Sequence, residues 1–534
     1  MHTGQDQQYR GISRRQFLGA LGIGAVAVGT TSVLPAPAQQ RFVLSEDRFG
    51  RLFPQLPAFF EQATESLRGA MREMGQEGGL MDAKDALDQG PILLITNPAL
   101  SVDNPNNPND TAGTTFMGQF MDHDMTFDLT SRLGLPTQPE ASVNTRTPAL
   151  DLDSVYGGGP DDDPELYTFE RGHAPKFKIA FGGLFEDLPR AANGTAIIAD
   201  PRNDENLMLA GLHAAFLLFH NKAVEYVEER DPHAAPDAVF REARRLTRWH
   251  YQWLILHEFL PLFIGQSRVD DILAHGRQFY RPKEAFMPVE FQGAVYRFGH
   301  SLVRPSYRAN LAGDKGAPFF GMIFGPAGQG QADPIDLRGG ARARRRFIGW
   351  QTFFDFGPTF TDGPGNPTPA IRPNKMVDTH ISTPLFRLPL AAIATGDPPI
   401  SLPQRNLLRH ITWSLPSGQS IARAIGLPSS QVLSSRDLAD LRDFGHSLDV
   451  STPLWYYVLK EGQVMEGGLR LGPVGGRIVG EVIIGLLQLD QRSYLAAEPR
   501  WRPILPTRSG RVTGDFKMID FLTFAGVAPD QRGQ

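Results

Sequence analysis

Apolar residues recur at helical spacing along most of this chain, and few segments alternate with a period of two. The pattern predicts a helix at 207–227 that is apolar on nearly every face, which is typical of a buried helix. A second predicted helix, 238–262, is basic at first and then apolar, and Pro261 marks its expected end. Further helices are predicted at 289–303, 341–354, 435–444 and 477–493.

Long stretches rich in Pro, Gly and Asn separate these helices, at 97–115, 357–374 and 396–404. Loops of that length are usually functional or disordered. The chain has no internal repeat, and no linker divides it into halves of different composition. We therefore expect one large, mainly α domain over residues 39–534, with long irregular loops.

Residues 1–38 have a character of their own. Ser13-Arg14-Arg15-Gln16-Phe17-Leu18 precedes an apolar run to Val28, and Ala36-Pro37-Ala38 follows. A basic region, a short apolar region and a small-residue site are typical of an export signal, and the paired arginines resemble the signal that the bacterial twin-arginine machinery reads. The run is shorter than the about 20 residues that span a bilayer. We expect cleavage near Ala38, export to the periplasm or medium, and no transmembrane anchor.

Composition limits the chemistry. The 534 residues are 41% hydrophobic, enough for a sizeable core, and cysteine is absent. Disulfides, iron–sulfur clusters, a thiolate haem ligand and cysteine-based zinc sites are therefore excluded, so that any metal must be held by His and oxygen ligands. The formal net charge of −5 argues against nucleic acid as a partner.

The stretch Gly118-Gln119-Phe120-Met121-Asp122-His123-Asp124 places one imidazole between two carboxylates among bulky apolar residues. Burying such charges is unfavourable unless a cation or cofactor offsets them. At helical spacing Gln119 and His123 are i and i+4 and project from one face, whereas Asp122 and Asp124 point elsewhere. The alternative is an ordinary helix that ends in a solvated Asp-His-Asp tip.

Two further segments carry polar residues in unusual settings. Arg202 and Glu205 stand i and i+3 just before the predicted helix at 207–227. A helix N-terminus favours the acid but does not explain the arginine. His300 ends an apolar run, and Gly299 before it leaves space for close approach. The alternative is a core histidine with a structural role.

A loop carries the third constellation. Thr147, Asp151 and Asp153 alternate with apolar residues, which suits a loop that wraps a cation. Hard cations such as calcium take six to eight oxygen ligands from carboxylates, hydroxyls and carbonyls. Two aspartates in an ordinary Asx-rich turn are the alternative.

Together these segments resemble the animal-type haem peroxidases of the peroxidase–cyclooxygenase superfamily, over roughly residues 97–428. The resemblance implies a helical haem peroxidase domain that binds haem b and one calcium ion and reacts with hydrogen peroxide. It identifies His123 as the distal histidine and Gln119 as the glutamine of the halide pocket. Arg202 matches the catalytic distal arginine, and His300 matches the proximal iron ligand.

The resemblance also implies how haem and calcium are held. Asp122 and Glu205 match two carboxylates that can form esters with haem methyl groups. Some relatives add a sulfonium link from a methionine after the glutamate, but Asn206 stands here, so at most two links are expected. Asp153 stands where a serine is common, and the implied calcium ligands are Asp124, Thr147, Ala149, Asp151 and Asp153.

Two positions near the proximal histidine bear on function: one departs from the peroxidase pattern, and the other departs from the cyclooxygenase pattern. The partner of the proximal histidine is usually an asparagine, and the segment 402–428 matches it with Gln419. Cyclooxygenases use a tyrosine three residues before the proximal histidine; Arg297 stands there, and Tyr296 is one residue off, about 100° away on a helix.

We therefore expect a peroxidase that oxidises bromide, iodide or thiocyanate, with phenols as one-electron donors. The alternatives are a fatty-acid dioxygenase and a non-catalytic secreted haem- or calcium-binding protein. A zinc hydrolase is excluded at His257-Glu258-Phe259-Leu260-Pro261, because proline replaces the second histidine.

Overall fold

A computed structural model of the chain describes residues 47–182, 185–312, 316–325, 334–341, 345–363, 366–393 and 396–532. These residues belong to one compact unit, and the predicted mainly α architecture is confirmed. The predicted export signal at 1–38 lies outside the described residues.

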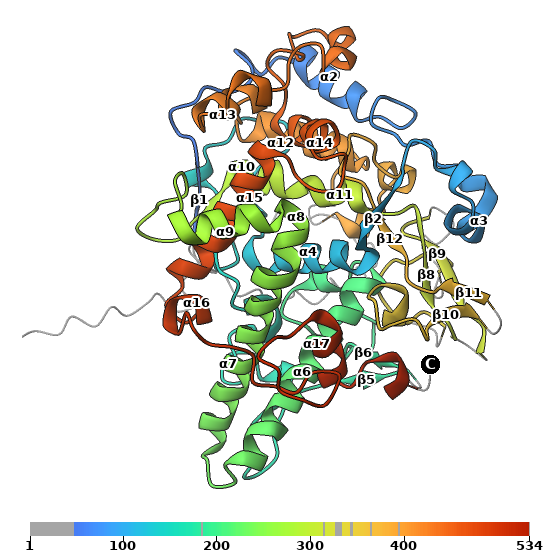
Figure 1. Cartoon of the computed structure of the whole chain (residues 1–534), viewed down its shortest axis with the longest axis vertical. Helices are drawn as coiled ribbons and strands as arrows, with labels where there is room; N and C mark the ends of the chain where they lie inside the picture. The colour runs from blue at the N-terminus through green and yellow to red at the C-terminus, as the bar shows by residue number, and fades with distance from the viewer. Residues whose placement is uncertain are drawn as a thin grey trace, which may run out of the picture. The chain divides into compact units, whose positions relative to one another are not determined.

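Helices make up most of the regular structure (Figure 1). The longest is α6, Leu207–Arg230, which pairs with α7, Pro236–Leu254. The other described α-helices are α2 (Glu65–Met74), α3 (Gly90–Thr96), α4 (Ala112–Met125), α5 (Asp153–Tyr156), α8 (Leu260–Ile264), α9 (Gln266–His275), α10 (Val289–Gly293), α11 (Gly299–Leu302), α12 (Leu402–Thr412), α13 (Gly418–Ala424), α14 (Leu454–Met465), α15 (Pro473–Leu489), α16 (Tyr494–Ala497) and α17 (Met518–Phe524).

The described strands are short and pair two by two. The pairs β12–β2, β3–β4, β5–β6, β8–β9 and β10–β11 are antiparallel, and β1–β7 is parallel. Their bounds are β1 (Phe49–Gly50), β2 (Asn106–Thr111), β3 (Tyr167–Thr168), β4 (Lys176–Phe177), β5 (Ala180–Phe181), β6 (Glu186–Asp187), β7 (Met287–Pro288), β8 (Ser306–Asn310), β9 (Phe319–Met322), β10 (Thr361–Gly363), β11 (Asn366–Pro369) and β12 (Pro373–Lys375).

Helix α4 lies at the centre of the fold. It contacts α6, α11 and β12, and Figure 1 shows it between the α6–α7 pair and the group formed by α11, α12 and α14. Phe120 of α4 stacks on Phe216 of α6, with ring centroids 4.4 Å apart. Because neighbours enclose α4, apolar residues cover most of its circumference. Its His123 and Asp124 are therefore buried, and the solvated-tip interpretation is wrong.

Several helix predictions need correction. The predicted helix 238–262 is not stopped by Pro261: α7 continues through a π-turn, Ile255–Phe259, into α8, where the proline occupies the first turn and needs no N–H donor. The predicted helix 289–303 is broken into α10, a 3₁₀ turn (Val295–Phe298) and α11. Within 341–354 and 435–444, the described residues form only the 3₁₀ turns Trp350–Thr352 and Ala439–Phe444.

Among the described helices, α6 has the length and apolarity of a membrane span. However, 83% of the residues in its apolar window are buried inside the protein, as expected of a core helix. Asn206 caps this helix, because its side chain accepts a hydrogen bond from the backbone N–H of Leu209 at 3.0 Å.

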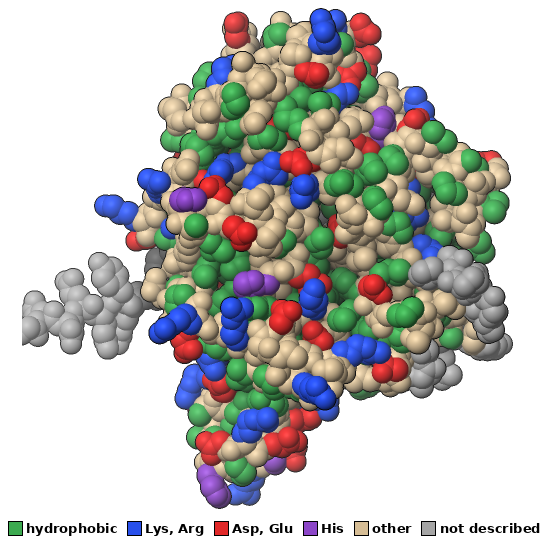
Figure 2. Space-filling view, in the orientation of Figure 1, with side chains coloured by type: hydrophobic (Ala, Val, Ile, Leu, Met, Phe, Trp, Pro, Cys, Tyr) green, Lys and Arg blue, Asp and Glu red, His purple; other side chains and the backbone are tan. Residues whose placement is uncertain are grey.

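The face drawn in Figure 2 carries acidic and basic side chains interspersed rather than a single basic patch.

Candidate active site

His123 and His300, the two histidines singled out by the sequence, line one cavity of about 260 Å³. His123 comes from α4 and His300 from α11, which pack against each other. Four more predicted residues line the same cavity, from α4 and from the segment before α6: Gln119, Asp122, Arg202 and Glu205. The tertiary structure thus brings together residues that lie far apart along the chain.

His123 is held by its Nδ1 atom, which lies 2.9 Å from Oδ1 of Asn203. Its Nε2 atom lies 3.9 Å from Oε1 of Glu205, another cavity residue. Burial, reinforced by the nearby Arg202 guanidinium, lowers the pKa of His123 to about 3. The imidazole is therefore neutral and can accept a proton.

Arg202 is fixed from several sides. Its guanidinium donates to both carboxylate oxygens of Asp200, at 2.7 and 3.0 Å, and to the carbonyls of Thr126 and His123, at 2.8 and 2.9 Å. It also lies 3.9 Å above the Phe127 ring. Four of its five N–H donors are used in this way. The fifth, on Nη1, has no acceptor among the described residues.

Burial opposes ionisation of Asp200, yet the Arg202 and Arg146 guanidinium groups outweigh it and hold the pKa of that carboxyl well below its usual range. Arg146 donates from Nε to Asp200 at 2.8 Å and is itself 0% exposed. Asp200 is therefore a permanent negative charge between two arginines, and it fixes the orientation of Arg202.

Two carboxyl groups of the cavity have raised pKa values. Burial raises the pKa of Glu205 to about 8, although Arg202 opposes the shift. Burial also raises the pKa of Asp122. Gln119 donates to Glu205 from Nε2 and accepts from Asn206 at 3.3 Å. Both predicted ester-forming residues thus face the cavity.

His300 has a different partner from the one expected. Its Nδ1 lies 2.7 Å from the amide nitrogen, Nδ2, of Asn406 on α12. Burial, with a contribution from Arg297, lowers the pKa of His300 to about 3. Nε2 is the ring nitrogen left outside this contact, and it can ligate a metal when the single proton of the neutral imidazole is on Nδ1.

The prediction that Gln419 is this partner is wrong. Gln419 lies on α13, where it donates to Oγ1 of Thr452 at 2.8 Å and accepts from the backbone N–H of the same residue at 3.0 Å. Its amide is thus used to join α13 to the segment before α14. Asn406 is the only asparagine between residues 402 and 428, and this was the sequence signal that pointed to it.

The cavity suits a flat, largely apolar cofactor with acidic groups. A Cβ atom built on Gly299 meets nothing within 4 Å, so the backbone beside His300 leaves room for close approach. Arg405 and Arg409 line the cavity and offer positive charge. The apolar part of the lining includes Phe263, Phe298, Leu302, Val303, Ile323, Phe324, Leu385 and Leu388. These features fit haem.

Tyr296 lines the cavity as well. Its hydroxyl donates to the carbonyl of Gly118 on α4 at 3.2 Å, and its ring stacks on Phe291 with centroids 4.7 Å apart. Arg297 instead donates from Nε to the carbonyl of Gln292 at 2.8 Å. The Tyr296 hydroxyl is thus hydrogen-bonded to α4.

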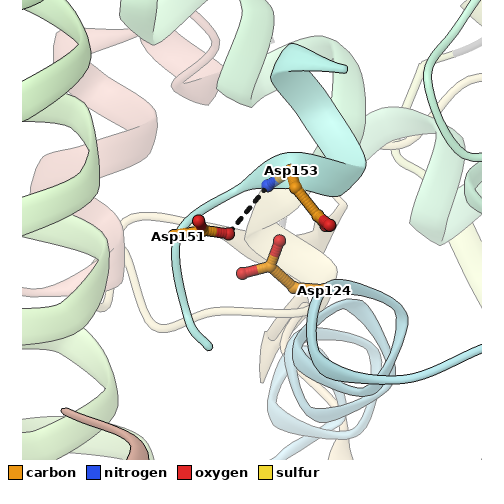
Figure 3. Close-up of side chains that lie close together, drawn as sticks. All are labelled: Asp124, Asp151 and Asp153. Atoms are coloured by element: carbon orange, nitrogen blue, oxygen red, sulfur yellow. Dashed lines mark hydrogen bonds between the residues drawn. The ribbon is translucent and has the colours of Figure 1, made fainter. Parts of the chain in front are cut away.

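A second cluster lies at the C-terminal end of α4 (Figure 3), and its Asp124 directly follows His123 in the sequence. Carboxylate oxygens of Asp124, Asp151 and Asp153 all lie within 4.8 Å of one another, and all three residues are buried. Burial and the neighbouring carboxylates raise the pKa of Asp124. Three adjoining buried carboxylates suit a hard cation.

Local contacts order this cluster. Asp124 accepts from the backbone of Leu152 at 3.1 Å, and Asp153 accepts from the backbone of Thr147 at 3.0 Å. The other oxygen of Asp153, Oδ1, is buried without a hydrogen-bond partner among the described residues, although Nη1 of Arg146 lies 3.7 Å from it as an ion pair. Ala149 donates its N–H to the carbonyl of Thr147 at 2.7 Å, in the same loop.

Comparison with known proteins finds matches for part of the chain. Residues 128–319 match the family model described as animal haem peroxidase. Chorion peroxidase of Aedes aegypti is 32% identical over 174 residues, which are 30% of this chain and 22% of that protein. Myeloperoxidase of Mus musculus is 23% identical over 309 residues, which are 56% of this chain and 36% of that protein. The chain thus spans between 22% and 36% of the length of these relatives.

Solved structures share the fold over most of the chain. Peroxidase A from Dictyostelium discoideum superposes with a TM-score of 0.58 at 16% identity, covering 91% of this chain and 97% of that one. Fatty acid alpha-dioxygenase of Oryza sativa superposes with a TM-score of 0.50 at 16% identity, covering 73% and 70%. At these identities the likeness concerns the fold alone.

Proposed function

We propose that this chain, whose residues 128–319 match the animal haem peroxidase family, uses hydrogen peroxide to oxidise small anions, namely bromide, iodide or thiocyanate, with phenols as one-electron donors. The observation that carries the proposal is the pairing of His123 and His300 across one cavity that Arg202 also lines. For a halide X⁻ the reaction is X⁻ + H₂O₂ + H⁺ → HOX + H₂O.

His123 would move the proton that this reaction requires. Its neutral imidazole takes a proton from one peroxide oxygen on Nε2 and returns it to the other oxygen as the O–O bond breaks. Arg202 would stabilise the negative charge that develops on the departing oxygen, through its remaining Nη1 proton. Because Asp200 and two carbonyls already hold the guanidinium, little reorientation is needed.

His300 would hold haem through Nε2, with Asn406 supporting its Nδ1 atom. Haem, when bound, supplies the iron and the redox equivalents for peroxide reduction. An imidazole that ligates through Nε2 carries its proton on Nδ1. The structure places Nδ2 of Asn406 against Nδ1 and its Oδ1 against Arg297, so the amide would have to turn over to present its oxygen to that proton. Asp122 and Glu205 line the cavity and would form up to two esters with haem b.

Calcium would occupy the cluster of Asp124, Asp151 and Asp153, with oxygen atoms of Thr147 and Ala149 completing the site. The three buried carboxylates, whose oxygens lie within 4.8 Å of one another, support this proposal. Because Asp124 follows His123 directly, a bound cation would fix the end of α4 and thereby the distal imidazole.

Steady-state assays of the haem-loaded protein test the proposal. Peroxide-dependent oxidation of bromide, iodide and thiocyanate is expected, and His123→Gln is expected to reduce it by about 100-fold or more, since general acid–base catalysis contributes 10²–10⁴. Gln419→Leu, which alters an amide that does not line the cavity, is the matched control. A protein that binds haem but oxidises neither anions nor phenols would contradict the proposal.

A fatty-acid dioxygenase is the second candidate, because Tyr296 lines the cavity. Two observations favour the peroxidase. The Tyr296 hydroxyl donates a hydrogen bond to the carbonyl of Gly118, and Arg297 stands at the cyclooxygenase tyrosine position. Oxygen uptake with a long-chain fatty acid distinguishes the two, because only a dioxygenase consumes oxygen and incorporates it into the lipid. A protein without a Soret band after haem supplementation would instead indicate a non-catalytic role.

Export through the twin-arginine machinery is proposed from residues 1–38 alone. Fusing these residues to a folded reporter in a bacterial host is expected to place the reporter in the periplasm. Replacing Arg14 and Arg15 by lysines is expected to retain the reporter in the cytoplasm, and unchanged export of that variant would contradict the twin-arginine route.

A further inference from the structure

Asn203 lies between two buried histidines. Its Oδ1 atom is 2.9 Å from Nδ1 of His123, and its Nδ2 atom is 3.0 Å from Nδ1 of His213. Asn203 and His213 are both 0% exposed. Neither residue lines the cavity, so neither can touch a substrate held there. The contact joins α4, the 3₁₀ turn η5 (Pro201–Asp204) and α6.

The chemistry of an amide sets the direction of these two hydrogen bonds. Its oxygen only accepts and its nitrogen only donates. His123 must therefore carry its proton on Nδ1 and donate to Asn203, which leaves the Nε2 lone pair of His123 bare. His213 must receive the Asn203 donor on an unprotonated Nδ1, and its own proton is then on Nε2.

Burying the His213 ring is unfavourable for the free energy of folding. Its Nε2 atom is buried without a hydrogen-bond partner among the described residues, although its ring lies edge-on to Phe120, with centroids 6.5 Å apart. An unpartnered buried polar group destabilises a protein by about 1–3 kcal/mol, whereas an apolar side chain of similar size avoids that penalty. The contact with Asn203 supplies a reason for a histidine at this position.

We propose that Asn203 and His213 are positioning residues that hold His123 in the one tautomer able to accept a proton from peroxide. The inference rests on the proposed peroxidase function. His213 anchors the amide nitrogen, which prevents the Asn203 side chain from reversing. Asn203 in turn keeps the proton of His123 on Nδ1. The opposite tautomer would present an N–H to the cavity and could not act as a base.

The first test measures tautomers directly and does not depend on turnover. In full-length protein with ¹⁵N-labelled histidine, His123 is expected to show the Nδ1–H tautomer and His213 the Nε2–H tautomer. His123→Gln and His213→Gln assign the signals. Asn203→Leu is expected to leave His123 as a mixture of both tautomers, and Asn203→Asp is expected to restore the Nδ1–H form, because a carboxyl group offers an acceptor oxygen.

The second test uses the haem-loaded protein. Asn203→Leu and His213→Leu are expected to lower kcat/KM for peroxide by about 10- to 100-fold, the usual effect of removing a supporting hydrogen bond. KM for the reducing substrate is expected to stay unchanged. His213→Gln is expected to recover most of the rate, since its amide oxygen can accept from Asn203 Nδ2.

His220→Gln is the matched control, because His220 lies on the same helix, is also 0% exposed, and bonds Tyr156 instead. Its peroxide kinetics are expected to equal those of the unmodified protein. An Nε2–H tautomer at His123, or equal effects of the His213 and His220 variants, would overturn the inference. Absence of peroxide turnover in the unmodified protein would overturn the proposed function instead, while the tautomer measurement would still decide this inference.

Discussion

Asn406 of α12 places its side-chain amide 2.7 Å from Nδ1 of His300 on α11, although the two residues are 106 positions apart in the sequence. Its Oδ1 atom faces Nη1 of Arg297 at 3.4 Å. The indole N–H of Trp455 donates to the carbonyl of Arg297 at 3.0 Å. His300 is therefore supported by a chain of contacts that reaches from α12 to α14.

Changing Asn406 is expected to alter the iron that His300 would hold. Asn406→Asp presents a carboxylate to Nδ1–H, makes the imidazole a stronger donor and lowers the midpoint potential of the haem. Asn406→Leu removes the acceptor, raises the potential and weakens haem binding by about 10- to 100-fold. Spectroelectrochemical titration and haem retention measure both effects. Gln419→Leu is the control; a potential that responds to Gln419 rather than Asn406 would contradict the assignment.

Arg202→Lys is expected to reduce kcat/KM for peroxide by about 10²–10³-fold, the range found when a preorganised donor is lost. A lysine is a single point charge and cannot keep four N–H bonds in a fixed fork. Arg190→Lys is the matched control, because Arg190 pairs with Asp204 at 2.7 Å but does not line the cavity. Stopped-flow mixing with peroxide measures the rates. Comparable losses in both variants would indicate a structural effect.

Calcium is expected to stabilise the protein. A cation present at 100 times its Kd raises the free energy of unfolding by about 2.7 kcal/mol, if it does not bind the unfolded chain. Asp124→Asn and Asp153→Asn are expected to abolish this increment in denaturant titrations with calcium or with a chelator. Asp161→Asn alters an exposed aspartate outside the cluster and is expected to retain it. An unchanged increment in the Asp153 variant would argue against that ligand.

Covalent attachment of haem is expected to depend on Asp122 and Glu205. In denaturing gels stained for haem, the unmodified chain is expected to retain the stain. The double variant Asp122→Ala with Glu205→Ala is expected to release it, and each single variant to retain one link. Asp128→Ala changes a third carboxylate of the same cavity and serves as control. Haem that leaves the unmodified chain would show that no ester forms.

The buried histidines are expected to make stability fall in acid. Burial lowers the pKa of His220 from 6.5 to about 3, so below pH 6.5 the unfolded chain binds a proton that the folded protein does not. The stability contributed by this histidine is present above pH 6.5 and is lost as the pH falls toward 3.

His220→Gln removes that titration. The variant is expected to be less stable than the unmodified protein at pH 7.5, and the difference is expected to narrow by about 1.4 kcal/mol per pH unit between pH 6 and 4. His250, whose pKa burial also lowers to about 3, gives an independent repeat with His250→Gln. Urea unfolding at several pH values measures the difference. A difference that does not vary with pH would show that folding does not lower the pKa of the histidine.

The local motifs were readable from the sequence because their chemistry lies within a few residues. Gln119, Asp122, His123 and Asp124 share one turn-and-a-half of helix, so that spacing alone set which side chains could point into a common site. The apolar surroundings of these polar residues indicated burial, and the structure places His123 at 4% and Asp124 at 0% exposure. The mainly α class followed from the same periodicity.

Only the tertiary structure decided which distant groups complete the site. Asn406 and Gln419 both carry amides in neighbouring helical segments, and only the residue type, asparagine, favoured Asn406 as the partner of His300. The tertiary structure decided between them, because it places the amide of Asn406 on α12 beside His300 and that of Gln419 beside Thr452. Likewise, Asn203 and His213 acquire a role only because α6 packs against α4. Local pattern determines a side chain's direction on its own element, whereas packing between elements determines what that side chain meets.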